Sequence, residues 1–541
     1  MEIQSNPLLS AFSHPEFYPH AVGQIQFIET HISWVVLTGE YAYKIKKPIN
    51  LGFLDYSTLA LREKYCREEL RLNRRYAPEL YLEVIAVHLS DQNPSDQQIN
   101  LQGAGRTIEY AVKMSQFDPQ QLLLNKLTSS EINISFFAQL AQEINNFHRH
   151  CEQSRTGEFG TGDKIWQAVE QNFKQIRAIK PEFDSKLAPI FDWTLQQHHK
   201  LRAAFAERKT SGFIRECHGD LHLGNIALVE NKPLLFDGIE FNPNLRWIDT
   251  VSELAFLLMD LDASGANEYS ARLLNSYLEE SGDYQGLILL TYYKVYRAMV
   301  RAKVELLHCQ QERGQQESSQ QESSQLERKQ GAEQIHQENF LNYIALAQRY
   351  TQTKTPQLFI THGVSGAGKT TIARLLADSL PAIHLRADIV RKQLHGLDNL
   401  ASSRSLPGEG IYSAEANKKT FKTLQDLAKS SLRAGFNTIV DATFLHKAVR
   451  DQFAEIAKQL KLPFTIIDCE ISAKEALKRV NARKNDASEA TEQVLMRQLD
   501  SREPLSAEEI HQSIRIDSGK IINTDQLHNL NSMKKNTYPV S

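Results

Sequence analysis

The sequence predicts two domains in tandem: an α+β domain with a small sheet and a mostly helical lobe, then an α/β domain with a parallel sheet. The chain of 541 residues is too long for a single hydrophobic core. Strand-like segments precede a long helical stretch in the first part, whereas strands alternate with helices after residue 357. A Gly-x-x-x-x-Gly-Lys-Thr motif follows the first strand of the second part, as expected of a parallel α/β sheet.

The first domain, residues 1–350, opens with strands and one helix. β-Branched and aromatic residues predict strands, and a Leu/Glu/Arg-rich stretch that ends before Pro78 predicts a helix. The predicted strands are 32–38, 41–46, 82–88 and 109–114, and the helix is 59–76. From about Pro119 to Arg208 the pattern is helical. This order predicts two lobes with a cleft between them.

A low-complexity segment interrupts the end of this domain. Gln-Gln-Glu-Ser-Ser occurs twice in tandem, at 315–319 and 320–324. Such composition buries too little apolar surface to offset chain entropy, so we expect a flexible insertion over residues 309–333, with partial helix as the alternative. A short linker follows at 351–356, and the polar tail 526–541 is expected to be disordered.

The second domain, residues 357–525, follows a βαβ pattern. Apolar strands are predicted at 358–361, 437–440 and 464–468, with helices at 370–379 and 473–484. The glycine motif, Gly363-Val-Ser-Gly-Ala-Gly-Lys-Thr370, lies between the first strand and the first helix. Its backbone N–H groups would surround phosphate oxygens, Lys369 would reach the β- and γ-phosphates, and Thr370 would ligate Mg²⁺. The predicted nucleotide-binding residues are Gly363, Ser365, Gly366, Ala367, Gly368, Lys369, Thr370 and Thr371.

Further polar residues of this domain resemble those of small P-loop kinases. Asp388-Ile-Val-Arg391, Asp441 at a strand end, and Arg479 and Arg483 one turn apart resemble the zeta-toxin/polynucleotide-kinase group over residues 357–510. The resemblance implies that Asp388 is the base and that Arg391 holds acceptor or phosphate. It also implies that Asp441 serves metal or acceptor, and that Arg483, with Arg479, neutralises the transferring phosphoryl group. From the residues alone, the alternatives are a helix N-cap for Asp388, a strand-end turn for Asp441, and a solvated helix face or an (i, i+4) ion pair for the two arginines.

The first domain carries its own polar loop, His218-Gly-Asp-Leu-His-Leu-Gly-Asn225. Asp220 could accept a hydroxyl proton, and Asn225 and Asp237 could ligate Mg²⁺, because the Asp-x-x-x-x-Asn spacing separates these roles along one loop. Glu240 is a candidate helper. Asp249 is interpreted either as a brace of this loop or as a helix N-cap.

The small sheet would supply a lysine for the nucleotide phosphates and a glutamate to pair with it. Lys44 and Lys46 lie on the same strand face, and Glu68 and Glu69 lie on the next helix. We select Lys44 and Glu69 and keep the other two as rivals. A Gly-x-Gly-x-x-Gly loop is missing before this strand, and Gly39-Glu40-Tyr41 is its candidate replacement. Residues 114–117 are the expected hinge beside adenine.

The loop resembles the catalytic loop of aminoglycoside phosphotransferases, which have a protein-kinase-like fold. Apart from the Gln/Glu/Ser insertion and the tail, the chain resembles a bacterial family of bifunctional aminoglycoside phosphotransferase-like/ATP-binding kinase fusions. The resemblance implies ATP and Mg²⁺ as cofactors and two sites that phosphorylate hydroxyl groups of small molecules. Two alternatives stay open: a nucleic-acid 5′-hydroxyl kinase in the second domain, and a non-catalytic ATP-binding regulatory module in the first.

Composition limits the partners and the compartment. A net charge of −3 gives no overall attraction to nucleic acid or anionic membranes. The five cysteines are scattered, which favours a reducing compartment over a disulfide framework. No signal peptide or membrane span is evident, so a cytoplasmic protein is expected. The oligomeric state is not predicted.

Overall fold

The computed structural model describes residues 6–52, 54–90, 98–101, 105–129, 131–317, 323–406, 408–482 and 487–519. The chain divides into two compact units. The first comprises Met1–Gln139, Asn146–Val169 and Arg202–Leu257, and the second comprises Leu140–Asn145, Glu170–Leu201 and Leu258–Ser541. The predicted tail 526–541 lies outside the described residues.

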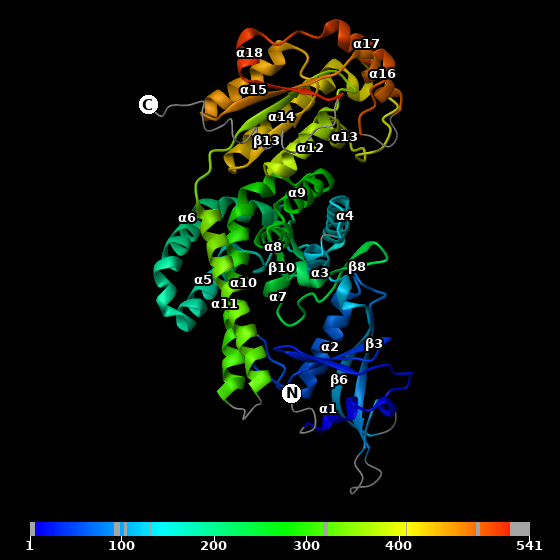
Figure 1. Ribbon diagram of the computed structural model, residues 1–541, viewed down its shortest axis with the longest axis vertical. Coiled ribbons are helices and arrows are strands. Elements are labelled where there is room, and N and C mark those ends of the chain that lie inside the picture. Colours follow the sequence, from blue (N-terminus) through cyan, green and yellow to red (C-terminus); the bar gives the residue numbers. More distant parts are fainter. Residues whose placement is uncertain are drawn as a thin grey trace. The chain divides into compact units, whose positions relative to one another are not determined.

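The first unit contains a six-stranded antiparallel sheet in the order β1-β2-β3-β6-β4-β5. Its strands are β1 Gln26–Glu29, β2 Ser33–Leu37, β3 Tyr41–Lys46, β4 Tyr81–Leu89, β5 Ile99–Asn100 and β6 Arg106–Ser115. Helix α2, Leu59–Asn73, lies along one face of this sheet (Figure 1). Its Cys66 packs with Tyr81 and Val112 of the strands. The predicted strands and helix are therefore confirmed.

Two short antiparallel strand pairs flank the polar loop of the first unit. Strand β7, Ile214–Glu216, pairs with β10, Trp247–Asp249, and β8, Ile226–Val229, pairs with β9, Lys232–Leu235. The loop 218–225 connects β7 to β8 and ends in the short 3₁₀ helix η5, Leu223–Asn225. The remaining helices here are α1 Pro7–Phe12, α3 Leu123–Thr128 and α7 Pro243–Arg246.

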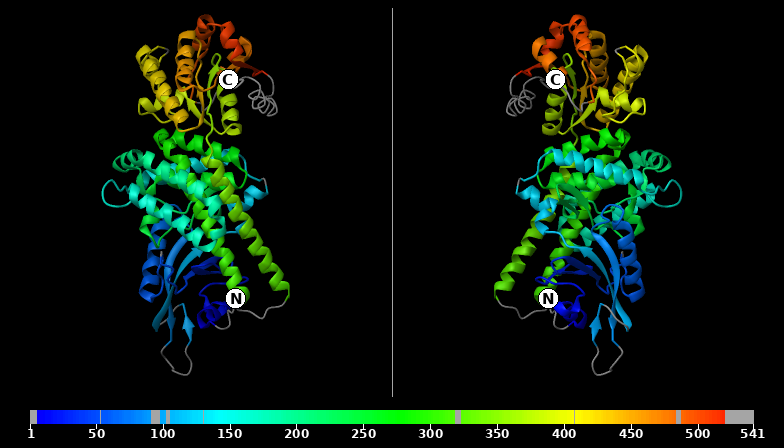
Figure 2. Two further views of the ribbon diagram at one scale, coloured as in Figure 1. Left: turned by 90° about the vertical axis from the view of Figure 1, so that its left-hand side faces the viewer. Right: turned by 90° about the vertical axis from the view of Figure 1, so that its right-hand side faces the viewer.

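Longer helices make up the middle of the chain. They are α4 Ser135–His150, α5 Gly162–Ile179, α6 Asp184–Thr210, α8 Thr250–Ala263, α9 Asn267–Ser281, α10 Leu287–Glu317 and α11 Ser323–Thr351. Helices α10 and α11 run side by side as a hairpin (Figure 2). The expected flexible insertion is helical over residues 309–317 and 323–333, because its Gln and Glu residues are good helix formers and extend two helices that pack on each other.

The second unit ends in a five-stranded parallel sheet with the order β12-β13-β11-β14-β15. The strands are β11 Leu358–His362, β12 Ala382–Arg386, β13 Asn437–Asp441, β14 Phe464–Glu470 and β15 Ser513–Asp517. The helices are α12 Lys369–Ser379, α13 Ala387–Leu394, α14 Ala414–Arg433, α15 Lys447–Leu460, α16 Ala473–Asn481, α17 Glu492–Ser501 and α18 Ala507–His511. The three predicted strands form the centre of the sheet, whereas its edge strands, β12 and β15, are absent from the prediction.

Helix α9 covers the open edge of this sheet within the second unit. The Asn275 side chain donates to Ala382 O at 2.9 Å and accepts from His384 N at 2.8 Å, as a neighbouring strand would. One turn away, the carbonyl of Glu279 accepts from Gln393 at 2.7 Å. The edge strand β12 therefore has its backbone groups satisfied by a helix, which also protects it from pairing with other chains.

Among the described residues, no helix is both long and apolar enough to cross a membrane.

Candidate active sites

The polar loop of the first unit brings together two of the predicted residues. Asn225 donates its side-chain amide to Asp220 O at 3.0 Å and to Asp220 Oδ2 at 3.3 Å. The Asp220 side chain is 37% exposed, and His222 Nε2 lies 3.5 Å from its Oδ2. A carboxylate that is partly open to solvent and fixed by an amide from the same loop is suited to accept a proton from a bound hydroxyl.

Helix α8 holds this loop through a residue that sequence reasoning missed. Glu253 is fully buried and accepts from Gly219 N at 2.7 Å. His148 of α4 lies 3.0 Å from its other carboxylate oxygen. Burial raises the pKa of Glu253, but its hydrogen bonds and the nearby imidazoles of His148 and His218 outweigh this and lower it overall. The buried carboxylate therefore stays ionised beside Asp220.

Asp249 does not contact this loop directly. Its carboxylate pairs with Arg208 at 2.6 and 2.7 Å and accepts from Val251 N at 2.9 Å. Asp249 therefore acts as the N-cap of α8, which was one of its two interpretations. Its ion pair with Arg208 also links β10 to α6. The brace of the loop is Glu253, one helical turn further on.

The segment after β9 carries the predicted metal ligand Asp237. This residue has φ +64°, in the left-handed region, and its N–H donates to Tyr81 Oη at 3.0 Å. Gly238 N donates to Asn73 Oδ1 at 2.8 Å. A Cβ atom on Gly238 would lie 2.1 Å from Tyr76 Oη. The protein therefore needs glycine after Asp237, where kinases of the Asp-Phe-Gly type have phenylalanine.

The structure distinguishes the two rival lysines of β3. Lys44 Nζ forms ion pairs with Glu69 at 2.8 Å and with Asp237 at 2.5 Å. Lys46 Nζ, fully buried, pairs with the other oxygen of Glu69 at 2.7 Å and with Glu240. Asp237 is 44% exposed, whereas Glu240 is buried. Lys44 therefore faces Asp237, the predicted metal ligand. Lys46 instead forms a buried ion pair with Glu240, the candidate helper.

Glu68, the rival of Glu69, points elsewhere. It pairs with Arg71 and Arg246, each at 2.8 Å. Glu69, in contrast, is shared by both lysines, and the attraction of these two cations outweighs its burial and lowers its pKa. The predicted pair Lys44–Glu69 is therefore formed.

The turn 39–41 lies beside the expected hinge. Gly39 N donates to Gln116 Oε1 at 2.9 Å, and Gln116 N donates to Glu40 O at 2.9 Å. Gly39 has φ +103°, which a side chain would disfavour. The turn that we selected in place of a glycine-rich loop thus contacts residues 114–117.

In the second unit the glycine motif forms a tight loop between β11 and α12. A Cβ atom on Gly363 would lie 2.7 Å from Cys469 O, and one on Gly366 would lie 2.6 Å from Ala476 O. Lys369 Nζ donates to Val364 O at 2.9 Å, and Ser365 N donates to Gln498 Oε1 at 2.7 Å. The loop therefore precedes a helix N-terminus, the arrangement that binds phosphate.

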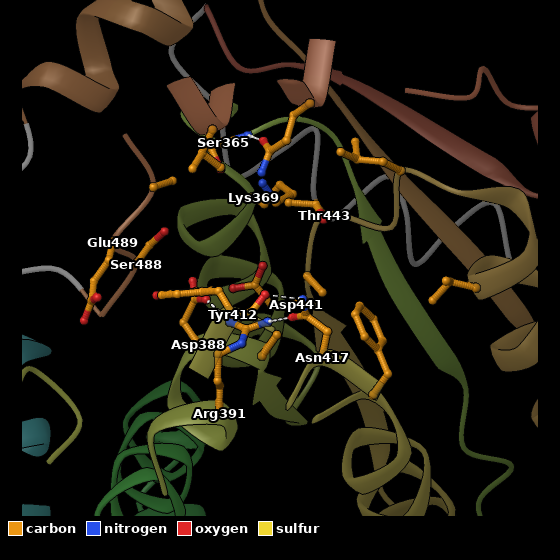
Figure 3. A pocket seen from close by; sticks show the side chains of 18 of the residues that line it. Ser365, Lys369, Asp388, Arg391, Tyr412, Asn417, Asp441, Thr443, Ser488 and Glu489 are labelled. Atoms are coloured by element: carbon orange, nitrogen blue, oxygen red, sulfur yellow. Dashed lines mark hydrogen bonds and ion pairs between the residues drawn. The ribbon is translucent and has the colours of Figure 1, made fainter. Parts of the chain in front are cut away.

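A cavity of about 860 Å³ extends from this loop. Ser365, Lys369 and Thr370 line it, but Thr371 does not and is exposed. Asp388, Arg391, Tyr412 and Asn417 gather further along it, with Asp441 beside them (Figure 3). The cavity thus joins the phosphate-binding residues to the predicted base.

Arg391 is the centre of that cluster. It donates to Asp388 Oδ1 at 2.6 Å and to Asn417 Oδ1 at 3.2 Å, and its guanidinium lies 5.0 Å from the centre of the Tyr412 ring. Asp388 lies inside the first turn of α13, where it pairs with Arg391 and does not serve as the N-cap. Tyr412 and Asn417 were missed because nothing local in the sequence marks them as neighbours of Asp388.

Asp441 ends β13 at the floor of the cavity. His384 Nε2 lies 3.3 Å from its Oδ2, and Thr361 Oγ1 lies 3.4 Å from its Oδ1. Burial raises the pKa of Asp441, but His384, Lys369 and Arg386 outweigh burial and lower it. An ionised carboxylate at this position is chemically suited to a Mg²⁺ ion or to a metal-bound water.

The predictions for Arg479 and Arg483 have different outcomes. Arg479 donates to Ser518 O at 2.8 Å, and a Cβ atom on Gly368 would lie 3.5 Å from Arg479 Nη1. It therefore lies beside the phosphate loop. Arg483 lies outside the described residues, so its predicted role stays a prediction.

Comparisons with known proteins agree with this geometry. A family model described as "AAA domain" matches residues 358–505, which begin at β11 and include the glycine loop. The chain is 28% identical over 487 residues to the uncharacterized proteins Rv2004c of Mycobacterium tuberculosis and Mb2027c of Mycobacterium bovis. Each alignment covers 88% of this chain and 90% of the relative.

Three solved structures illustrate weaker similarities. A sugar kinase from Janibacter shares 22% identity over 33% of this chain and 94% of its own, with a TM-score of 0.26. A gluconokinase from Sinorhizobium meliloti shares 16% identity over 34% of this chain and 99% of its own, with a TM-score of 0.25. A choline/ethanolamine kinase family protein from Mesorhizobium loti shares 11% over 64% of this chain and 97% of its own, with a TM-score of 0.32.

With TM-scores this low, the fold assignment rests on the geometry. The Lys44–Glu69 pair, the loop 218–225 and Asp237 give the first domain an α+β protein-kinase-like arrangement. The parallel sheet and the glycine loop make the second an α/β P-loop nucleotide-binding domain.

Proposed function

We propose that this protein is an ATP- and Mg²⁺-dependent enzyme with two phosphotransferase sites, each of which transfers the γ-phosphoryl group to a hydroxyl of a small molecule. The observation that carries the proposal is that each site combines a phosphate-binding lysine with a separate carboxylate for the acceptor. In the first these are Lys44 and Asp220, and in the second Lys369 and Asp388.

In the first site, Lys44 would bind nucleotide phosphates while Glu69 holds its ammonium group in place. Asn225 and Asp237 offer an amide and a carboxylate oxygen, ligands that Mg²⁺ prefers. Bound Mg²⁺ would neutralise charge on the phosphates. Asp220 would accept the proton of the acceptor hydroxyl, and Glu253 would keep the loop in position through Gly219.

In the second site, the backbone of 363–370 and Lys369 would bind the phosphates, and Thr370 and Asp441 would hold Mg²⁺. Asp388 would orient the acceptor hydroxyl and take its proton. Arg391 would keep the carboxylate aimed into the cavity, because Asn417 and Tyr412 restrict the guanidinium from two further sides. Transfer in such sites depends chiefly on positioning and charge neutralisation.

Two alternatives remain for single domains. The second domain could use a nucleic-acid 5′-hydroxyl as acceptor, and the first could bind ATP without catalysis. The first domain retains Asp220, Asn225 and Asp237, which argues against a domain that binds ATP without catalysis.

The test is Mg²⁺-dependent ATP turnover by the full chain, by Lys369→Ala and by Asp220→Ala, each with a panel of hydroxylated acceptors. We expect each variant to lose a different acceptor-stimulated activity. If only Lys369→Ala loses activity, the first domain is a binding module and the proposal of two transferase sites fails. Circular dichroism of both variants checks that the chain still folds.

A further inference from the structure

The cavity of the second domain continues well beyond Asp388, along helix α14. Its lining residues on this helix are Asn417, Lys418, Phe421, Lys422 and Gln425, a spacing that places them on one face. From Asn417 to Gln425 this face is about 12 Å long at 1.5 Å per residue. The opposite wall comes from His446, Val449 and Gln452 at the start of and along α15. At the far end, Gln425 donates to Gln452 at 2.7 Å.

The described part of this cavity has a surplus of positive charge. Its three lining carboxylates are each within 3.3 Å of a basic side chain: Asp388 near Arg391, Asp441 near His384, and Glu489 near Lys392. Lys418 and Arg497 line the cavity as well, and neither has an ion pair or a side-chain hydrogen bond with any described residue. Lys422 has Asp426 at 3.0 Å, but both side chains are exposed, so this pair is weak.

A buried nitrogen atom of Arg391 also indicates that the cavity binds a ligand that offers a hydrogen-bond acceptor. Arg391 is only 7% exposed, and its Nε atom has no hydrogen-bond partner among the described residues. A buried guanidinium nitrogen without an acceptor costs free energy unless a ligand or water supplies one. Arg391 lines the cavity at the predicted phosphoryl-transfer point, where an oxygen of a bound acceptor could meet this need.

The surplus charge is not explained by ATP alone. The phosphates of ATP belong at the N-terminus of α12, where Lys369 and the loop N–H groups serve them. Lys418 and Lys422 belong to α14, which carries Asn417 of the acceptor cluster. Phe421 lies on the same face between the two lysines and offers an apolar surface on which a ring can pack.

Resting on the proposed transferase activity of this domain, we propose that its acceptor is an anionic, ring-containing small molecule. Its hydroxyl lies at Asp388, its ring lies against Phe421, and its carboxylate or phosphate binds Lys418 and Lys422. A neutral acceptor would leave these cations unmatched, and a polycationic one would be repelled. The same charges disfavour a polycationic acceptor at this cavity.

The experiment compares matched acceptors with and without the anionic group: ribose 5-phosphate with ribose, glucuronate with glucose, and a nucleoside 5′-monophosphate with its nucleoside. We expect the anionic member of at least one pair to stimulate ATP turnover with a KM at least about tenfold lower, a factor equal to about 1.4 kcal/mol. The double variant Lys418→Ala/Lys422→Ala should raise that KM about tenfold without changing the KM for ATP. Lys419→Ala, an exposed neighbour that does not line the cavity, is the matched control and should behave as the unaltered chain.

Calorimetry on the Lys369→Ala chain separates this inference from the proposed function, because it measures acceptor binding without transfer. Weaker binding of the anionic acceptor after loss of Lys418 and Lys422 supports the inference even where turnover is absent, and absent turnover then counts only against the transferase activity. Equal binding of the anionic and the neutral acceptor of each pair, or an unchanged KM in the double variant, overturns the inference of an anionic acceptor. So does exclusive binding of a 5′-hydroxyl oligonucleotide, which would favour the nucleic-acid alternative.

Discussion

Two lysines on one strand, Lys44 and Lys46, have different surroundings although they share Glu69. Lys44 faces the partly exposed Asp237, and Lys46 lies in the interior between Glu69 and Glu240. Burial opposes the charge on Lys46, but the two carboxylates outweigh burial and raise its pKa. The same residue type therefore serves the proposed nucleotide site in one case and the internal structure in the other.

Exchange of each lysine for methionine separates these roles. Lys44→Met should abolish nucleotide binding at the first site with a smaller loss of stability, because Glu69 keeps Lys46 and Asp237 is 44% exposed. Lys46→Met leaves Glu69 and Glu240 short of a partner in the interior and should destabilise the protein by roughly 3–5 kcal/mol. Urea unfolding and binding of a fluorescent ATP analogue measure the two effects. Equal destabilisation by both exchanges would contradict the assignment.

His218 predicts a pH dependence for the first site. Its Nε2 lies 2.8 Å from Phe236 O, and its Nδ1 accepts from Asp220 N at 3.3 Å, which requires the neutral ring. Burial lowers its pKa, and the facing carboxylates Glu253, Asp220 and Asp237 only partly oppose this. For a lowered pKa, the stabilisation is fully present above about pH 6.5 and is lost as the pH falls through the folded-state pKa.

We therefore expect activity at the first site to fall at a pH below 6.5, as the pH passes through the lowered pKa of His218 and the protonated ring loses its bond to Asp220 N. A pH profile of the first-site activity, measured with the Lys369→Ala chain, shows this acid limb. The His218→Gln variant should lack it while keeping activity at neutral pH. An unchanged acid limb in the variant would assign the titration to another group.

At the residue scale, sequence reasoning found the groups that lie in motifs. The sequence identifies four of these residues because the chemistry of each site fixes their spacing along a short segment. They are Asp220, Asn225, Asp237 and Lys369. Glu253, His148, Asn417 and Tyr412 were missed because tertiary contacts, not local spacing, bring them to the sites. An acid just before the apolar stretch 254–259 of helix α8 was the available signal for Glu253.

At the scale of elements, helix α9 completes the parallel sheet. Arg272, Asn275 and Glu279, spaced along one face, contact α12, β12 and α13 in turn. Arg386, which ends β12 next to α13, pairs with the Glu279 carboxylate at 3.2 Å. The helix that carries Asp388 is therefore positioned partly by α9, which precedes α10 and α11 in the chain.

Replacement of Asn275 by leucine removes both hydrogen bonds to the edge of β12. Two buried backbone groups lose their partner, so we expect a loss on the order of 2–4 kcal/mol. Hydrogen exchange should accelerate in β12 in particular. Asn267→Leu, at the exposed first residue of the same helix, is the control and should change neither stability nor exchange. Unchanged protection of β12 in Asn275→Leu would contradict the role of α9.

The edge strands show where element prediction from sequence fails. The central strands β11, β13 and β14 are apolar because both of their faces are buried, and the sequence reveals them. Strand β12 contains His384 and Arg386, and β15 contains Arg515 and Asp517, so neither has a continuous apolar run. Their pairing with neighbours, and not their composition, makes them strands. The Gln/Glu/Ser segment is helical on both sides of residues 318–322, which lie outside the described residues, because neighbouring helices extend into it.

At the scale of the whole molecule, the account requires two separate nucleotide sites in one chain. Each site has its own lysine, its own acidic group for a metal ion and its own acceptor carboxylate. No residue is common to the two described constellations. Loss of one site should therefore leave nucleotide binding at the other intact.

The most direct measurement is the number of Mg²⁺-dependent binding sites per chain for a non-hydrolysable ATP analogue, determined by calorimetry. We expect two sites in the unaltered chain, with one lost in Lys44→Met and the other lost in Lys369→Ala. Binding of a single equivalent by the folded, unaltered chain, or loss of all binding in either variant, would contradict the presence of two separate nucleotide sites.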